Sequence, residues 1–285
     1  MGHKIENTDT DHGSRVAKFD PHDIARYKDL AVEISQAAGA RILELFLPEI
    51  AITCKADETP LTAADLAANK IIVDRLKEID SELPVLTEES HEIALDERST
   101  WETYWLVDPL DGTREFIKQN GEFSVNIALI HRNAPILGVV HAPVLDITYW
   151  ASRGEGAWKQ VAEESPRRIS VRTAPEKRVT VAVGWTSQLS PELERFLENL
   201  GEHSELRMGS ALKSCMVAEG RADIYPCLGP TGEWDTGAVQ CIVEEAGGRI
   251  TDTQMQALRY NTRESLLNPD FFTFGNSDHR WSDYL

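Results

Sequence analysis

Apolar residues recur every three or four positions between residues 21 and 47, and this spacing predicts an amphipathic helix that begins at Pro21. The apolar positions are Ile24, Tyr27, Leu30, Ala31, Ile34, Ala38 and Ile42. A second helix is predicted over residues 62–80, because Thr62 and Asp65 form a start that resembles a capping box. Two helices are therefore expected before any strand.

Short apolar runs typical of β-strands replace the helical spacing in the next part of the chain. They cover residues 84–87, 104–107, 124–130, 136–144 and 147–152. Neighbouring runs of this length predict one mixed sheet.

After about residue 165, predicted strands alternate with predicted helices. The strands are 179–184, 222–226 and 271–276, and the helices are 191–200, 210–219 and 234–248, the last with a Gly-Gly stop. We therefore expect two halves, residues 21–165 and 166–285, linked through SPRRISVRTAPEKR. Residues 1–20 are polar and are expected to form a flexible tail.

Composition adds limits to this picture. The chain has 285 residues, of which 41% are apolar and 27% charged, and no apolar run approaches the length of a membrane helix, so a soluble protein without an integral membrane segment is expected. Four widely spaced cysteines favour a reducing compartment, the cytoplasm, with a peripheral position at the inner membrane face left open. The net charge of −18 argues against nucleic acid as a partner, so an anionic substrate would need local positive charge. The oligomeric state is not predicted.

The usual nucleotide-loop, dinucleotide, zincin and serine-hydrolase motifs are absent from the sequence. Cys215 and Arg221 do match C-x5-R, a pattern in which a thiolate attacks phosphorus. Such a cysteine needs a helix N-terminus to lower its pKa, whereas Cys215 falls about five residues into a predicted helix. A buried structural cysteine is the favoured interpretation.

Acidic residues follow two of the predicted strands. Glu88 comes after the strand 84–87, and Asp108 and Asp111 come after the strand 104–107 in WLVDPLDGTREF. Ligands in α/β proteins bind at the carboxyl ends of strands, and acids brought together there raise one another's pKa unless a cation intervenes. Oxygen ligands without histidine or cysteine suit Mg²⁺ better than Zn²⁺.

The alternative is that D-P-L-D-G-T forms only a tight turn, since Asp, Pro and Gly are typical turn residues. Asp235 adds a fourth acid at the start of a predicted helix, although it has an alternative role as an N-cap. On local sequence alone, Asp57 is a solvated loop residue and Lys213 a surface lysine. Lys213 is also one of few cations close to these motifs.

Four segments together carry a resemblance to a known family. TEES, WLVDPLDGTREFIKQNGEFSVNIALI, GSALKSCMVAEGRADIYPCLGPTGEWDTGA and RESLLNP resemble the 3'(2'),5'-bisphosphate nucleotidases of CysQ type, within the lithium-sensitive inositol monophosphatase superfamily. The resemblance runs from about residue 24 to the end of the chain. It implies an α/β (α+β) fold, a layered α/β/α/β/α sandwich.

The resemblance also implies site residues. It assigns Mg²⁺, two or three ions, to Glu88, Asp108, the carbonyl of Leu110, Asp111 and Asp235. It assigns activation of the attacking water to Asp57 and Thr113. The substrate-binding set is Glu88, Leu110, Asp111, Gly112, Thr113, Ser210, Lys213 and Asp235, of which Ser210, Lys213 and Asp235 come from the second half.

The implied reaction is removal of the 3'-phosphate from adenosine 3',5'-bisphosphate, which gives AMP and phosphate. An inositol monophosphatase or a sugar bisphosphatase on the same scaffold is the alternative, and a non-catalytic nucleotide or metal sensor is a further one. One departure from the family pattern concerns Gly237 and Val239, where the family usually has alanine and glycine. This change puts the packing beside the site, and with it substrate preference, in question.

Overall fold

The first layer of the protein consists of the two predicted helices. The computed structural model describes residues 23–46, 52–54, 60–90, 92–185 and 189–285, so the predicted tail and the predicted start at Pro21 lie outside the described residues. Helix α1 spans Asp23–Leu45 and helix α2 spans Ala63–Ile79, which confirms both helices. A short antiparallel pair, β1 (Ile52–Cys54) and β2 (Pro60–Thr62), precedes α2.

A seven-stranded sheet forms the second layer, with its strands in chain order from β3 to β9. The strands are β3 (Val85–Thr87), β4 (Thr103–Asp111), β5 (Ser124–His131), β6 (Ala134–Ala142), β7 (Ile147–Ser152), β8 (Gly156–Val161) and β9 (Arg167–Ile169). β3 and β4 are parallel and the other pairs are antiparallel, so the sheet is mixed as predicted. β9 lies in the predicted link between the halves, and the division near residue 165 stays a prediction.

A five-stranded sheet in the order β11-β10-β12-β14-β13 forms the fourth layer. Its strands are β10 (Val179–Val183), β11 (His203–Arg207), β12 (Ile224–Cys227), β13 (Arg249–Asp252) and β14 (Phe271–Phe274). The strands predicted at 179–184, 222–226 and 271–276 are confirmed. β11 and β13 were not predicted, because HSELR and RITD contain too few apolar residues to show an alternating pattern.

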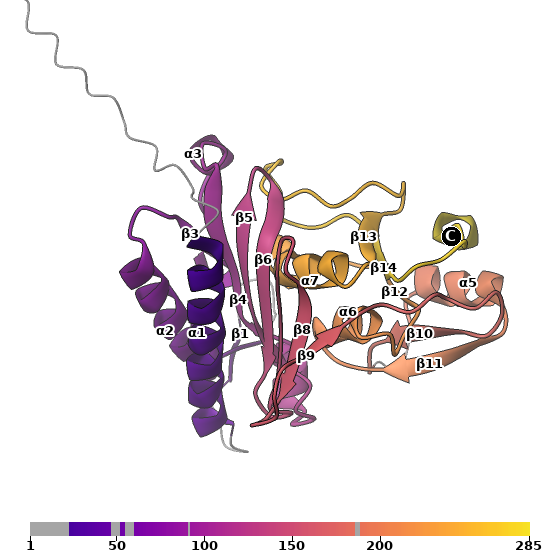
Figure 1. The fold of residues 1–285 in the computed structure, drawn as a ribbon, viewed down its shortest axis with the longest axis horizontal. Helices are drawn as coiled ribbons and strands as arrows, with labels where there is room; N and C mark the ends of the chain where they lie inside the picture. The colour runs from indigo at the N-terminus through magenta and orange to yellow at the C-terminus, as the bar shows by residue number, and fades with distance from the viewer. Residues whose placement is uncertain (1–22, 47–51, 55–59, 91, 186–188) are drawn as a thin grey trace, which may run out of the picture.

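Helices fill the space on both sides of the second sheet (Figure 1). α6 (Leu212–Ala218) and α7 (Glu233–Glu245) lie between the two sheets, and α5 (Pro191–Leu200) covers the far face together with the short helix η2 (Trp281–Tyr284). Trp105 and Val107 of β4 face α1 and α2, whereas Tyr104 and Leu106 face the layer of α7. This period-two alternation produces the expected α/β/α/β/α sandwich.

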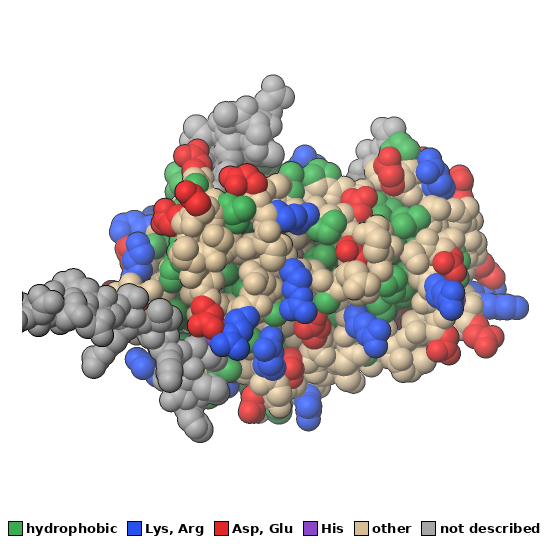
Figure 2. Space-filling view, turned by 90° about the horizontal axis from the view of Figure 1, so that it is seen from above, with side chains coloured by type: hydrophobic (Ala, Val, Ile, Leu, Met, Phe, Trp, Pro, Cys, Tyr) green, Lys and Arg blue, Asp and Glu red, His purple; other side chains and the backbone are tan. Residues whose placement is uncertain are grey.

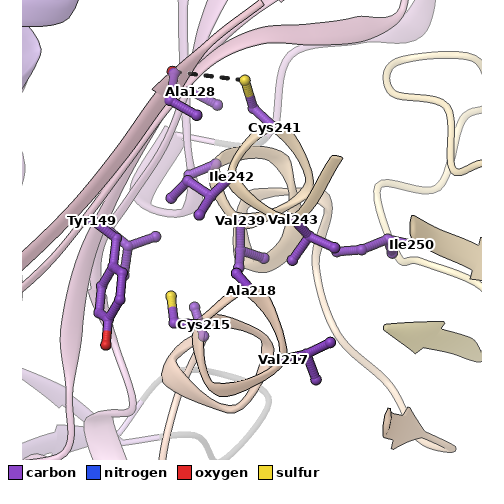
Figure 3. Close-up of a cluster of buried hydrophobic side chains, with 14 of the residues drawn as sticks. Ala128, Tyr149, Cys215, Val217, Ala218, Val239, Cys241, Ile242, Val243 and Ile250 are labelled. Atoms are coloured by element: carbon purple, nitrogen blue, oxygen red, sulfur yellow. Dashed lines mark hydrogen bonds between the residues drawn. The ribbon is translucent and has the colours of Figure 1, made fainter. Parts of the chain in front are cut away.

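Helix α7 packs unusually close to the first sheet. A Cβ atom added to Gly138 of β6 would lie 2.1 Å from the carbonyl oxygen of Ala238, and one added to Gly237 would lie 2.9 Å from Leu106 Cδ2. Figure 3 shows Val239 of α7 next to Ala218 of α6, between the sheets. Gly237 and Val239 thus serve the packing of α7, and the departure from the family pattern falls in the core.

Charged side chains cover the surface without separating by sign on the face drawn in Figure 2, where acidic and basic groups are interspersed. On that face the acidic groups do not gather into a single patch. Within the described part of the chain, no helix has both the length and the apolar character that a membrane crossing requires.

Gly138→Ala should lower the free energy of unfolding by about 1–3 kcal/mol, because the new methyl group meets the backbone of α7, which has no room to move away. Urea unfolding followed by circular dichroism measures the change. Gly184→Ala is the matched control, since a Cβ at Gly184 meets no atom within 4 Å. Equal stability of both variants would contradict the close contact between α7 and the sheet.

Candidate active site

The end of β4 carries two of the predicted acids. The pairing of β4 with β5 shifts register between Asp108 and Asp111, so the strand bulges where the acids occur. The Leu110 N–H donates to Asp108 Oδ1 at 3.0 Å, and Gly112 then turns the chain with φ 91° into α4 (Thr113–Ile117). A left-handed φ favours glycine, so Gly112 makes the bend that places both acids at the sheet edge.

Two other elements bring further acids to this edge. Glu88 begins the short helix η1 (Glu88–Ser90) directly after β3, and β3 runs parallel to β4. Asp235 lies in the first turn of α7, where its Oδ2 accepts a hydrogen bond of 2.7 Å from the Gly232 N–H. One carboxylate oxygen from each of Asp108, Asp111 and Asp235 lies within 4.8 Å of the other two. We call these three residues the acid cluster.

Electrostatic repulsion within the acid cluster is strong. Burial, followed by the charges of Glu88, Asp111 and Asp235, raises the pKa of Asp108 well above its usual range. Burial also raises the pKa of Asp235 to about 7, with the charge of Asp111 adding to the effect. Asp108 Oδ2 is buried and has no hydrogen-bond partner among the described residues.

The raised pKa values and the unpaired oxygen fit a divalent cation. Buried acids at this distance are stable together only when they are protonated or when a cation lies between them. An oxygen-only donor set suits hard cations, which carry oxygen ligands. Asp108 and Asp111 of β4 thus meet Asp235 of α7, and the charge of Glu88 acts on Asp108 from η1. Their role as metal ligands stays a prediction.

The pKa of Asp111 is raised less than that of Asp235, because a positive charge and hydrogen-bond donors face Asp111. Burial raises its pKa to about 6, and the Lys213 charge opposes that rise. Its Oδ2 accepts hydrogen bonds from the Ala211 N–H at 2.5 Å and from Asn126 Nδ2 at 3.3 Å. Asn126 was missed in the sequence, although a polar residue within the apolar run SVNIALI was a visible signal.

Of the predicted catalytic pair, Asp57 and Thr113, the described residues include only Thr113. Thr113 Oγ1 donates to the Leu110 carbonyl at 3.4 Å, which puts its hydroxyl beside one predicted metal ligand. The Leu110 side chain is buried in the core, so only its backbone is available to a ligand. Asp57 lies outside the described residues.

A small pocket of about 70 Å³ adjoins the acid cluster. Its lining combines the acids with polar groups of the second half: Asp111, Ser210, Ala211, Lys213, Ser214, Tyr225, Thr231, Asp235, Thr236 and Phe271. Lys213 Nζ donates to the Ser210 carbonyl at 2.8 Å and lies 5.1 Å from the centre of the Tyr225 ring. Ser210 and Lys213, predicted from the second half, thus reach the acids of the first.

Asn268 supports the loop before Asp235 and was not predicted. Its Nδ2 donates to the Gly232 carbonyl at 2.5 Å, to Thr236 Oγ1 at 3.1 Å and to Thr231 Oγ1 at 3.2 Å. No local pattern in RESLLNP signals this contact, because its partners are more than 30 residues away in the chain.

Cys215 is the buried structural cysteine that the sequence favoured. It lies inside α6 rather than at its start, and burial raises the pKa of its thiol well above the usual range. Arg221 Nη1 lies 3.6 Å from Glu219 Oε1. A thiolate nucleophile of C-x5-R type is therefore wrong for this chain.

Comparisons with known proteins show which family has this fold. A model of the inositol monophosphatase family matches residues 23–277, so the chain belongs to that family. It is 44% identical over 245 residues to the 3'(2'),5'-bisphosphate nucleotidase CysQ of Escherichia coli (strain K12), across 85% of this chain and 97% of that protein.

Solved structures show the same likeness. CysQ from Bacteroides thetaiotaomicron, described as a bacterial member of the inositol monophosphatase family, is 36% identical with a TM-score of 0.75, over 88% of this chain and 97% of that one. The IMPase of Thermotoga maritima is 25% identical with a TM-score of 0.72, over 88% and 92% of the two chains. The chain is thus similar in sequence and fold to both kinds of phosphatase.

Mg²⁺ should stabilise the protein more at about pH 8 than at about pH 5. The folded-state pKa of the cluster acids is raised, so the stability they contribute is present below their unfolded pKa near 4 and is lost as the pH rises towards about 7. A bound cation offsets that loss and stabilises by about 2.7 kcal/mol at a hundred times its Kd. Thermal unfolding with Mg²⁺ and with a chelator measures the difference.

Asp108→Asn should remove this response to Mg²⁺ and raise the stability of the metal-free protein. The substitution replaces a buried carboxylate by a neutral amide of similar shape. The exposed turn residue Asp146 supplies the control, Asp146→Asn, which should keep the full response to Mg²⁺. A Mg²⁺ response that survives in Asp108→Asn would rule out the cluster as the cation site.

Proposed function

We propose that this protein removes the 3'-phosphate of adenosine 3',5'-bisphosphate in a metal-dependent hydrolysis that yields AMP and phosphate. The observation that carries the proposal is the acid cluster, with its unpaired Asp108 oxygen, directly beside a pocket that contains Lys213. The identity to CysQ nucleotidases supports the choice of substrate.

The residues that would hold Mg²⁺, two or three ions, are Glu88, Asp108, the Leu110 carbonyl, Asp111 and Asp235. When bound, Mg²⁺ polarises the phosphate and supplies the positive charge that stabilises the leaving oxygen. The chain itself holds the ligands in place: the Ala211 N–H binds Asp111, the Gly232 N–H binds Asp235 and the Leu110 N–H binds Asp108. Such bonds fix the carboxylates before substrate arrives.

Thr113 and Asp57 are proposed to act on the attacking water. The Thr113 hydroxyl lies at the Leu110 carbonyl and orients the attacking water by hydrogen bonding. Asp57 accepts the proton that this water loses. The water oxygen forms the new bond to phosphorus as the bond from phosphorus to the ribose 3'-oxygen breaks. That oxygen leaves as the 3'-hydroxyl of AMP after it takes up a proton.

Lys213 is proposed to bind the second phosphate of the substrate. Its ammonium group is partly buried beside Tyr225 and lowers the pKa of Asp111, so it supplies positive potential on the substrate side of the cluster. Ser210 lies next to Lys213, because the Ser210 carbonyl accepts a hydrogen bond from the Lys213 ammonium group. A phosphate at Lys213 would be held apart from the one at the acids.

An inositol monophosphatase or a sugar bisphosphatase is the alternative. The likeness to the IMPase of Thermotoga maritima favours it. The acid cluster would hold metal and, through it, a phosphate, and this does not select the alcohol part of the substrate. The partner is proposed to be a small phosphorylated molecule in either case. The cytoplasm is the proposed compartment, in keeping with three buried free thiols, at Cys215, Cys227 and Cys241.

Phosphate release from adenosine 3',5'-bisphosphate, its sulfated analogue, inositol 1-phosphate and fructose 1,6-bisphosphate should be highest with the first two and should stop with a chelator. Asp111→Asn should lower kcat/KM by about 100-fold or more, since loss of even an outer partner of a metal site costs 10- to 100-fold. Cys215→Ser is the control and should keep full activity. Preference for the inositol or sugar phosphate would establish the alternative.

Lys213→Met should reduce kcat/KM for adenosine 3',5'-bisphosphate by about 10- to 100-fold, the range for a lost hydrogen bond to a charged group. For adenosine 3'-monophosphate, which lacks the second phosphate, Lys213→Met should reduce kcat/KM much less. The surface variant Lys70→Met, which breaks only an exposed ion pair with Asp74, should affect neither substrate. An equal loss with both substrates would place Lys213 at the scissile phosphate instead.

A further inference from the structure

Trp185 is a large aromatic residue with 47% of its surface exposed, in the loop that follows β10. A single exposed apolar side chain needs no explanation on its own. The ring of Trp185 is however held in place, because its indole N–H donates a hydrogen bond to Glu122 Oε2. The indole has only this one polar atom, so its remaining surface is an apolar, aromatic face.

Glu122 connects Trp185 to the segment beside the acid cluster. The same Oε2 accepts a hydrogen bond of 2.7 Å from the Gly209 N–H. A Cβ at Gly209 would lie 2.5 Å from the Glu122 carbonyl, so only glycine allows this close approach. Trp185, from the second half, and Glu122, from the first, therefore meet at the residue that begins the Gly209–Ser210–Ala211 segment.

The Gly209–Ser210–Ala211 segment leads directly to the reacting end of the site. The Ala211 N–H donates to Asp111 Oδ2, two residues after the N–H that is bound to Glu122. Two residues of chain span at most about 7 Å. The Gly209 N–H that binds Glu122 therefore lies no farther than that from the Ala211 N–H that binds Asp111. In a nucleotide only a ribose separates the base from a 3'-phosphate, so one molecule can reach both places.

We infer that the exposed face of Trp185 is the surface on which the base of the nucleotide stacks while its 3'-phosphate lies at the acid cluster. This inference rests on the proposed function and names the residue that selects a nucleotide. Stacking on an aromatic ring is open to any base, since every base has a flat π face. Inositol and sugar phosphates have no such π face and gain less from Trp185.

The fixed orientation of the ring strengthens this role. A free surface tryptophan loses side-chain entropy when a ligand orders it, whereas Glu122 already holds the indole through its N–H. The hydrogen bond also leaves the ring face, rather than the N–H, as the group presented to a ligand. Trp185 is thus expected to act on binding and not on the chemical step.

AMP affinity, measured by isothermal titration calorimetry, tests the inference without turnover. Trp185→Ala should weaken AMP binding by roughly 5- to 100-fold, the range for loss of one base–aromatic stack, and Trp185→Phe should keep most of the affinity. Trp158→Ala is the matched control: Trp158 lies on β8, where its indole N–H donates to the Glu155 carbonyl at 3.2 Å, and AMP affinity should not change. Circular dichroism checks that each variant is folded.

Kinetics provide the second measurement. Trp185→Ala should raise KM for adenosine 3',5'-bisphosphate by the same factor and leave kcat unchanged, and inhibition by inorganic phosphate should be unaffected. Unchanged AMP affinity in Trp185→Ala would overturn the stacking role while leaving the proposed hydrolysis intact. AMP binding that depends on Trp185 in a protein that hydrolyses no nucleotide would support stacking and overturn the proposed function, and a wild-type protein that does not bind AMP would overturn both.

Discussion

Repulsion between closely spaced carboxylates, one of them buried and two partly buried, is the constraint on which the site of this protein depends. Asp108, Asp111 and Asp235 lie within 4.8 Å of one another, and Asp108 is only 1% exposed. Removal of such groups from water is costly, and their like charges add to the cost. A fold that keeps them together without a proton or a cation would lose stability, so the arrangement is suited to binding a cation.

Backbone groups hold the acids at these positions. Each acid of the cluster accepts a hydrogen bond from a main-chain N–H, donated by Leu110, Ala211 or Gly232. These donors belong to the bulged end of β4, to the segment before α6 and to the loop before α7. The site is therefore rigid only when the first sheet, α6 and α7 are all packed, which links the cation site to the fold as a whole.

Helix α7 makes this link because it lies between the two sheets and touches the first one at backbone distance. Gly138 and Gly237 permit the contact, and Asn268 holds the loop from which α7 begins. Asp235 is thereby brought to β4 across more than 120 residues of chain. The groups proposed to face a substrate, Lys213 and Trp185, come from the second half, whereas most of the acids come from the first.

The sequence by itself determined the elements and the kind of site. Period-two and period-3.6 spacing identified α1, α2 and most strands, and D-P-L-D-G-T with Glu88 and Asp235 identified an acid site, because these signals depend on neighbours within a few residues. The resemblance to a known family supplied the layer order and the pairing of the halves.

Only the tertiary structure decided which distant residues complete the site. Strands β11 and β13 form at low hydrophobicity because β10 and β14 offer them edges to pair with. Asn268 and the Trp185–Glu122–Gly209 contact carry no signal in the chain, since each acts through a partner on another element. Asn126 shows itself only as a polar residue in an apolar run, and its partner Asp111 cannot be read from that run. Local spacing specifies an element, but the convergence of these elements on one carboxylate cluster follows from the packing of two sheets around α7.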